Sequence, residues 1–126
     1  MRYLGVDLGL KKIGLAISEG EMATPLKTII DNNFEEAISK IVSIIEDEIA
    51  DLIIIGNPEG EMGRAVVKVA DRLKSEGFEV LLADETLSTQ RSQALMIAMG
   101  LKKSRRRDDN SIAAAIILQR YLDENK

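Results

Sequence analysis

Residues 2–18, which read RYLGVDLGLKKIGLAIS, decide the fold. Residues 2–7 and 12–18 are both short and rich in residues that favour β-strands, and Gly9 and a lysine pair lie between them. Two such runs joined by a short glycine-containing link are typical of a β-hairpin. The chain is therefore expected to begin with two antiparallel strands, the first ending at Asp7.

The segment after this hairpin predicts a third strand and then a helix. Residues 23–30 are expected to form the strand, at a sheet edge or beside a bulge, because Pro25 has no N–H group to donate. Asn33 is a suitable N-cap, and Glu36 occupies the third helical position after it. Apolar residues at helical spacing then extend this amphipathic helix to about residue 49.

The rest of the chain alternates between strand and helix patterns. Residues 52–55 form an unbroken apolar run, which suits a strand buried on both faces. The later elements are expected in this order: a helix around residues 66–73 ending near Gly77, a strand at 79–83, a helix around 87–98 closed by Gly100, and a last helix from Asn110 to Leu122. This order predicts one α/β domain over residues 1–126. Its mixed five-stranded sheet has three antiparallel N-terminal strands, then parallel strands, with helices on both faces.

Composition narrows the chemistry. The chain has 126 residues, of which 45% are hydrophobic, and it contains no cysteine and no histidine. Catalysis by Ser-His or Cys-His pairs and zinc sites built on those residues are therefore excluded. The sequence shows no signal-peptide pattern and no apolar run long enough to span a bilayer, so a soluble cytoplasmic protein is expected.

Acidic residues occur at three places that the predicted sheet would bring to one edge. Asp7 ends the first strand, Asp84 and Glu85 end the last, and residues 108–110 (Asp-Asp-Asn) open the final helix. Ligands of open α/β sheets gather at the carboxyl ends of the strands, and oxygen ligands suit Mg²⁺ or Mn²⁺. Each position also has a simpler interpretation, as a turn residue or a helix cap.

Basic residues gather in two places although the net charge is −4. The smaller cluster lies in the first hairpin and consists of Lys11 and Lys12. The larger cluster follows residue 101 and consists of Lys102, Lys103, Arg105, Arg106 and Arg107. Either cluster could contact nucleic-acid phosphates or form a solvated loop. With two Tyr, two Phe and no Trp, the chain offers little for base stacking, so recognition is expected to rely on backbone charge and shape.

Four motifs, in order and covering nearly the whole chain, resemble those of the YqgF or RuvX family, also labelled Holliday junction resolvases. They are residues 7–18 (DLGLKKIGLAIS), residues 56–58 (GNP) with Gly63, residues 84–89 (DETLST), and residues 110–123 (NSIAAAIILQRYLD). The resemblance implies an RNase H-like fold and a cytoplasmic nuclease. It further implies phosphodiester hydrolysis with a divalent metal, either in maturing the 5′ end of pre-16S ribosomal RNA or on branched DNA.

The resemblance also suggests roles for individual residues. Asp7 and Glu85 would ligate Mg²⁺ or Mn²⁺, with Asp84 as a nearby alternative, and Asn110 or Asp109 would complete the site. Phosphate contacts would come from the basic residues Lys11, Lys12, Arg105, Arg106 and Arg107. The expected partner is structured RNA such as pre-16S rRNA, or branched DNA, bound by a monomer or weak homodimer.

Three departures from the family pattern bear on activity. Asn110 stands where the family usually has Asp, Thr86 replaces the usual Arg, and the loop after Pro58 is shorter than usual. An asparagine offers a carbonyl oxygen but no charge, so one alternative is a catalytically silent nucleic-acid-binding factor. A second alternative is a nucleotide-handling protein, because the Asp-x-Gly hairpin also resembles the start of actin-like and sugar-kinase folds.

Overall fold

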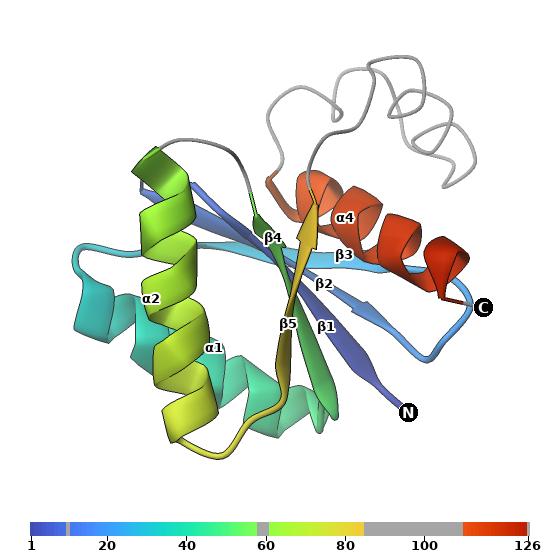
Figure 1. Cartoon of the computed structure of the whole chain (residues 1–126), viewed down its shortest axis with the longest axis horizontal. Helices are drawn as coiled ribbons and strands as arrows, with labels where there is room; N and C mark the ends of the chain where they lie inside the picture. The colour runs from blue at the N-terminus through green and yellow to red at the C-terminus, as the bar shows by residue number, and fades with distance from the viewer. Residues whose placement is uncertain (10, 58–60, 85–109, 126) are drawn as a thin grey trace.

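The computed structural model describes residues 1–9, 11–57, 61–84 and 110–125 (Figure 1). Its elements follow the chain in this order: β1 (Tyr3–Leu8), β2 (Lys12–Ser18), β3 (Thr24–Ile30), α1 (Phe34–Glu48), β4 (Leu52–Asn57), α2 (Glu61–Ser75), β5 (Val80–Asp84) and α4 (Asn110–Glu124). Each strand or helix predicted within these ranges is present, with its ends shifted by only a few residues. The helix predicted around residues 87–98 lies outside the described ranges.

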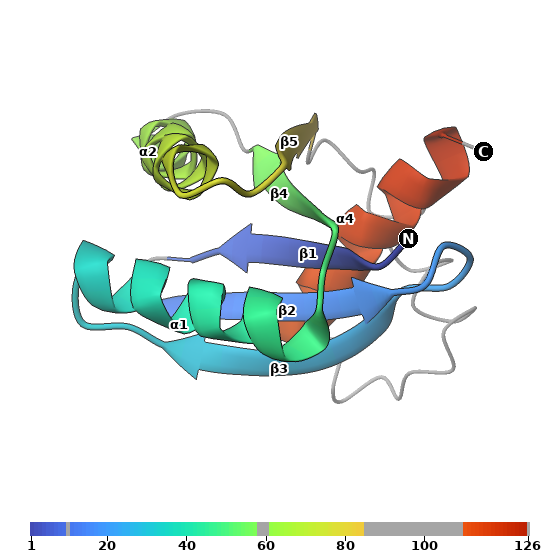
Figure 2. The same ribbon diagram turned by 90° about the horizontal axis from the view of Figure 1, so that it is seen from below.

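The five strands form one mixed sheet in the order β3-β2-β1-β4-β5. β1 pairs antiparallel with β2, and β2 pairs antiparallel with β3. β4 pairs parallel with β1, and β5 pairs parallel with β4. The sheet is twisted, so that β5 runs in a clearly different direction from β3 (Figure 2). The predicted α/β class and strand pairing are thereby confirmed.

Pro25 lies where its missing N–H group is tolerated. β3 is an edge strand, and the β2–β3 register shifts between Leu15 and Ala16, which pair with Lys27 and Pro25 respectively. The irregularity leaves Leu26 as the extra residue beside the proline. Both predicted reasons for accepting a proline, an edge position and a bulge, therefore apply together.

Helices cover both faces of the sheet (Figure 1). Alternate residues of β1, Leu4 and Val6, are fully buried in a cluster with apolar residues of α1 and α2. On the other face, α4 packs against a second cluster that includes Ala16 and Ile54. Residues 53–55 are fully buried, as predicted for a strand covered on both faces.

Polar contacts stabilise α1 and α2, the two helices that cover one face of the sheet. The Asn33 side chain caps α1 by accepting a hydrogen bond of 2.8 Å from the Glu36 backbone N–H, as the sequence predicts. Arg72 of α2 donates to both carboxylate oxygens of Glu35 in α1, at 2.7 and 3.0 Å. These hydrogen bonds lower the pKa of Glu35 below its ordinary value.

Within the described ranges, no helix is both long and apolar enough to cross a membrane.

The end of α1 has a strained residue that the sequence pattern did not predict. Ile49 lies in the left-handed region, with φ of 53° and ψ of 50°, and its N–H bonds to the Glu46 carbonyl. A β-branched residue is disfavoured there because Cβ approaches the neighbouring carbonyl oxygen. The side chain is 73% exposed, so little packing compensates for that strain.

Replacing Ile49 with glycine is therefore expected to raise the free energy of unfolding by about 1 kcal/mol, since glycine adopts this conformation without a Cβ contact. Urea denaturation should show a higher midpoint with an unchanged slope. Ile49→Ala is the control, because it removes the side chain but keeps the Cβ and should give no such gain. Equal effects of the two substitutions would contradict backbone strain at this position.

Candidate active site

Asp7 lies on the face of the sheet that α4 covers. Side chains alternate along a strand, so Tyr3, Gly5 and Asp7 share one face of β1. The ring of Tyr3 lies 6.3 Å from that of Tyr121 in α4, and a Cβ added at Gly5 would lie 2.8 Å from the Cβ of Leu118. Asp7 is a half-buried residue and lies near the carboxyl end of β1.

Three residues on adjacent strands form a row under the start of α4. Asp7 of β1 pairs with Gly14 of β2, and Gly14 pairs with Thr28 of β3. A Cβ added at Gly14 would overlap the carbonyl group of Asn110 and lie 2.7 Å from the Ser111 nitrogen. The first residue of α4 therefore rests directly on the cross-strand neighbour of Asp7.

One hydrogen bond and the position of one side chain define the start of α4. The Ser111 backbone N–H donates to Thr28 Oγ1 at 3.2 Å, which satisfies one of the N–H groups that a helix leaves unpaired in its first turn. The Asn110 side chain points towards the link between β1 and β2, because its Nδ2 would lie 3.3 Å from a Cβ on Gly9. Asn110 is consequently positioned between Gly14 and Gly9, beside the strand end that carries Asp7.

The other parallel strands end at the same edge of the sheet. β4 ends at Asn57 and β5 at Asp84, and these two residues are paired across the strands. Because β1, β4 and β5 are mutually parallel, their carboxyl ends face the same side (Figure 1). Glu85, the next residue in the sequence, lies outside the described ranges.

The predicted site residues divide into those the structure places and those outside its described ranges. It places Asp7, Asp84 and Asn110 at the ends of β1, β5 and the start of α4, and it places Lys11 and Lys12, both exposed, at the β1–β2 link. The residues outside the described ranges are Glu85, Asp109, Arg105, Arg106 and Arg107. Among the described residues, no three acidic side chains lie close enough together to form a metal-binding group.

Sequence reasoning missed the residues that position the helix. Gly5 and Gly14 were treated as ordinary strand residues, although each lies where α4 leaves no room for a side chain. Thr28 carried no recognised signal. At the other end of α4, Gln119 accepts a hydrogen bond from Ala23 N–H at 2.8 Å and donates to the Glu21 carbonyl at 3.0 Å. The detectable signal would have been a glycine in each of the two predicted hairpin strands together with a later helix rich in alanine.

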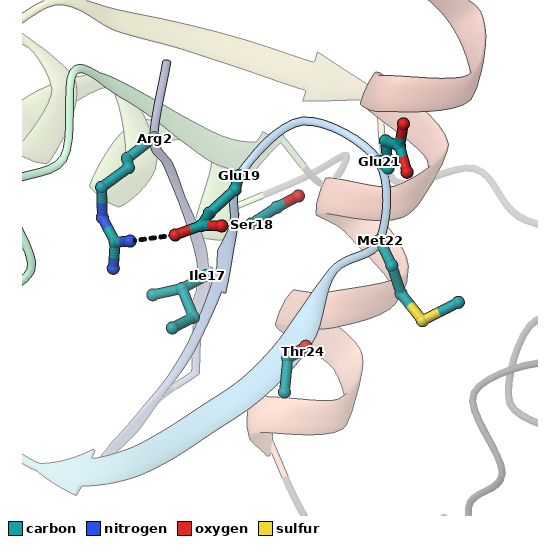
Figure 3. A pocket seen from close by; sticks show the side chains of 7 residues that line it. All are labelled: Arg2, Ile17, Ser18, Glu19, Glu21, Met22 and Thr24. Atoms are coloured by element: carbon teal, nitrogen blue, oxygen red, sulfur yellow. Dashed lines mark hydrogen bonds and ion pairs between the residues drawn. The ribbon is translucent and has the colours of Figure 1, made fainter.

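A cavity of about 540 Å³ lies at the opposite end of β1 (Figure 3). Its lining includes Arg2, Glu19 and Met22, and Arg2 forms an ion pair of 2.7 Å with Glu19. Arg2 also donates through Nε to the Glu48 carbonyl, so its guanidinium connects three separate segments. This cavity is separated from Asp7 by the length of the strand and belongs to the amino end of the sheet.

The backbone matches solved nucleases closely in shape. It superposes on Thermus thermophilus RuvC with a TM-score of 0.66 and 14% identity, over 99% of this chain and 96% of that one. It superposes on the fowlpox virus Holliday junction resolvase with a TM-score of 0.66 and 11% identity, over the whole of both chains. The chain therefore has the RNase H-like fold of RuvC-type resolvases.

Sequence comparison gives the family. The family model described as "RuvX: Holliday junction resolvase" matches residues 1–124. A Geobacillus kaustophilus protein named "Putative pre-16S rRNA nuclease" is 36% identical over the full length of both chains. A Pelagibacter ubique protein of the same name is 38% identical, over 98% of this chain and 88% of that protein. The chain belongs to the RuvX family of nucleases, as its motifs predicted.

The contact at Gly14 yields a direct test of how the site is assembled. Gly14→Ala is expected to lower the free energy of unfolding by about 3 kcal/mol, because the new methyl group overlaps the Asn110 carbonyl and must push α4 away. Urea denaturation measures this loss.

Gly20→Ala is the matched control. Gly20 has a φ of +124°, yet an added Cβ would meet nothing within 4 Å, so only backbone strain of about 1 kcal/mol is expected there. If Gly14→Ala were no more destabilising than Gly20→Ala, α4 would not be held against β2 as described.

Proposed function

We propose that this chain is a divalent-metal-dependent endonuclease that hydrolyses phosphodiester bonds during 5′-end processing of pre-16S rRNA. The observation that carries the proposal is the position of Asn110 over Gly14, next to Asp7, at the sheet edge where β5 leads into Glu85. The names of the Geobacillus and Pelagibacter relatives support the RNA substrate.

The residues at this edge suit a hard divalent cation. Asp7 and Glu85 offer carboxylate oxygens, Asn110 offers an amide oxygen, and the chain has no histidine or cysteine to favour zinc. We assign Mg²⁺ or Mn²⁺ to Asp7, Glu85 and Asn110, with Asp84 and Asp109 as neighbouring acids. Such a cation, when bound, supplies the positive charge that stabilises the attacking and leaving oxygens of a phosphodiester.

The protein itself supplies position and charge. The half-buried Asp7 sits on a strand with neighbours on both sides, so its carboxylate is held on a rigid element. Lys11 and Lys12 are exposed at the adjacent link and can bind phosphates on either side of the cleaved bond. Arg105, Arg106 and Arg107 are proposed to extend this contact. Local positive charge of this kind lets a chain of net charge −4 bind a polyanion.

Two alternatives rest on specific observations. The family description and the resemblance to resolvases that bind four-way junctions favour branched DNA as the substrate. Asn110 favours a binding factor with little activity, because an amide brings one negative charge fewer than the carboxylate usual at this position.

Cleavage assays on a 5′-extended 16S rRNA fragment and on a four-way DNA junction, each with Mg²⁺ and with Mn²⁺, distinguish these cases. Asp7→Ala is expected to reduce RNA cleavage more than about 100-fold, since even indirect partners of a bound metal contribute about 10- to 100-fold. Asp71→Ala, which removes an exposed carboxylate from α2, should leave the rate unchanged.

The same assay includes Asn110→Asp. A faster Asn110→Asp enzyme together with a slow but measurable wild type supports the proposed site. Wild-type cleavage no faster than that of Asp7→Ala, in either metal and on either substrate, with Asn110→Asp no faster than both, would show that Asp7 is not catalytic. Cleavage by Asn110→Asp alone would identify the natural protein as a binding factor.

Nucleic-acid binding should reveal the role of the lysine pair independently of cleavage. Replacing Lys11 and Lys12 with glutamine is expected to weaken RNA binding and to reduce the slope of log affinity against log salt by about 2, or about 1 for each lost phosphate contact. Lys74→Gln, at the far end of α2, serves as the control. An unchanged slope in the double variant would remove these lysines from the interface.

A further inference from the structure

A second cavity, of about 310 Å³, lies on the face of the sheet opposite Asp7. Its walls include Leu8 and Gly9 at the end of β1, Asp31 after β3, Phe34 at the start of α1, and Lys68 and Val69 of α2. Leu8 directly follows Asp7 and, because side chains alternate, points to the other face. The cavity therefore begins one residue from the proposed catalytic carboxylate.

Asp31 is the polar group of this cavity that lacks a partner. Its backbone N–H is fixed by a 3.2 Å hydrogen bond to the Lys11 carbonyl, whereas its Oδ1 is buried and has no hydrogen-bond partner among the residues that the structure describes. A carboxylate oxygen shut off from water without a donor is energetically unfavourable, and such groups are rare in folded proteins. A ligand that brings N–H groups into the cavity would supply the missing hydrogen bonds.

The rest of the cavity defines the shape and charge of such a ligand. Its walls are mainly apolar, from Leu8, Ile13, Phe34 and Val69, and the exposed Lys68 adds one positive charge. The volume lies at the lower end of the range for small-molecule sites, which suits one flat heterocycle with an attached phosphate. This combination requires an apolar body, an edge of N–H donors and a nearby negative charge.

We infer that this cavity binds the guanine base of a nucleotide next to the phosphodiester that the enzyme cleaves. Guanine presents N1–H and the N2 amino group side by side, which match the two oxygens of a carboxylate. Adenine and cytosine each place an acceptor beside their amino group, and uracil flanks its single N–H with two acceptors. The apolar walls contact the faces of the ring, and Lys68 contacts a phosphate of the same nucleotide.

This inference rests on the proposed nuclease function and adds base specificity to it. An RNA strand that lies along the carboxyl edge of the β-sheet can place one phosphate on the Asp7 face and the neighbouring base on the Leu8 face. The scarcity of aromatic residues fits this arrangement, because a single enclosed base needs apolar walls rather than a series of stacking rings.

Binding of free nucleotides tests the cavity without any need for catalysis. In NMR titrations of the wild-type chain, guanosine 5′-monophosphate is expected to shift the methyl signals of Leu8, Ile13 and Val69. It should bind about tenfold or more tightly than adenosine 5′-monophosphate, the size expected for hydrogen bonds to a charged group. Asp31→Asn should lose this preference and favour xanthosine 5′-monophosphate, because an amide can donate to the O2 carbonyl of xanthine. Asp71→Asn, the matched control on the exposed side of α2, should keep the preference for guanine.

RNA binding tests whether the base belongs to the substrate. With Asp7→Ala protein, which prevents cleavage, a short RNA containing one guanosine should bind several-fold more tightly than the same RNA containing inosine, which lacks the N2 amino group. Asp31→Asn in the same background should abolish the difference.

Two results would overturn the inference: no methyl shifts with guanosine monophosphate, or equal affinity for the guanosine and inosine RNAs. Neither result depends on cleavage. Failure of the nuclease proposal would instead appear as equal cleavage rates for wild type and Asp7→Ala.

Discussion

The absence of a side chain at Gly14 is the constraint on which the candidate site depends. Asp7, Gly14 and Thr28 lie side by side on three strands, and the first residue of α4 occupies the space where a Gly14 side chain would be. Only this close approach brings Asn110 to the strand that carries Asp7. Thr28 then fixes the helix by accepting the Ser111 N–H, and Gln119 ties its other half to the β2–β3 loop. A helix that met the sheet even one methyl group further out would separate the two halves of the site.

The strands and helices could be predicted because local patterns determine them. The apolar run at residues 52–55, the cap at Asn33 and the edge proline at 25 each have a local physical meaning, and each is confirmed. Asp7 could be placed at a strand end for the same reason. The role of Gly14 could not be predicted, because it depends on a helix nearly 100 residues later in the chain. Ile49 was missed because a helix that ends in the left-handed conformation usually has glycine or asparagine there, and nothing in the sequence marks this isoleucine for that conformation.

In the proposed enzyme, one face of the sheet carries the catalytic carboxylate and the other carries the cavity for a base. Asp7 on the α4 face and Leu8 on the α1 and α2 face are neighbours in sequence, so a single strand end carries both the proposed metal ligand and one wall of the cavity that contains Asp31. This arrangement couples them through one rigid element rather than through a loop. The acidic residues repel a polyanion, and the lysines at the β1–β2 link offset that repulsion only near the edge where cleavage is proposed. In the proposed enzyme, the local charge at this edge, rather than the net charge of the chain, therefore directs the nucleic acid.

The position of α4 also affects how the protein folds during synthesis. This helix leaves the ribosome after β1, β2 and β3, yet it covers all three strands. Until α4 is made, one apolar face of the sheet, including Ala16 and Ile54, has no cover from it. Contacts between such distant segments form slowly, and an uncovered sheet face promotes association with other chains. Because Asn110 opens the same helix, covering the sheet and bringing Asn110 to Asp7 are one event, and a nascent chain lacking α4 cannot assemble this site.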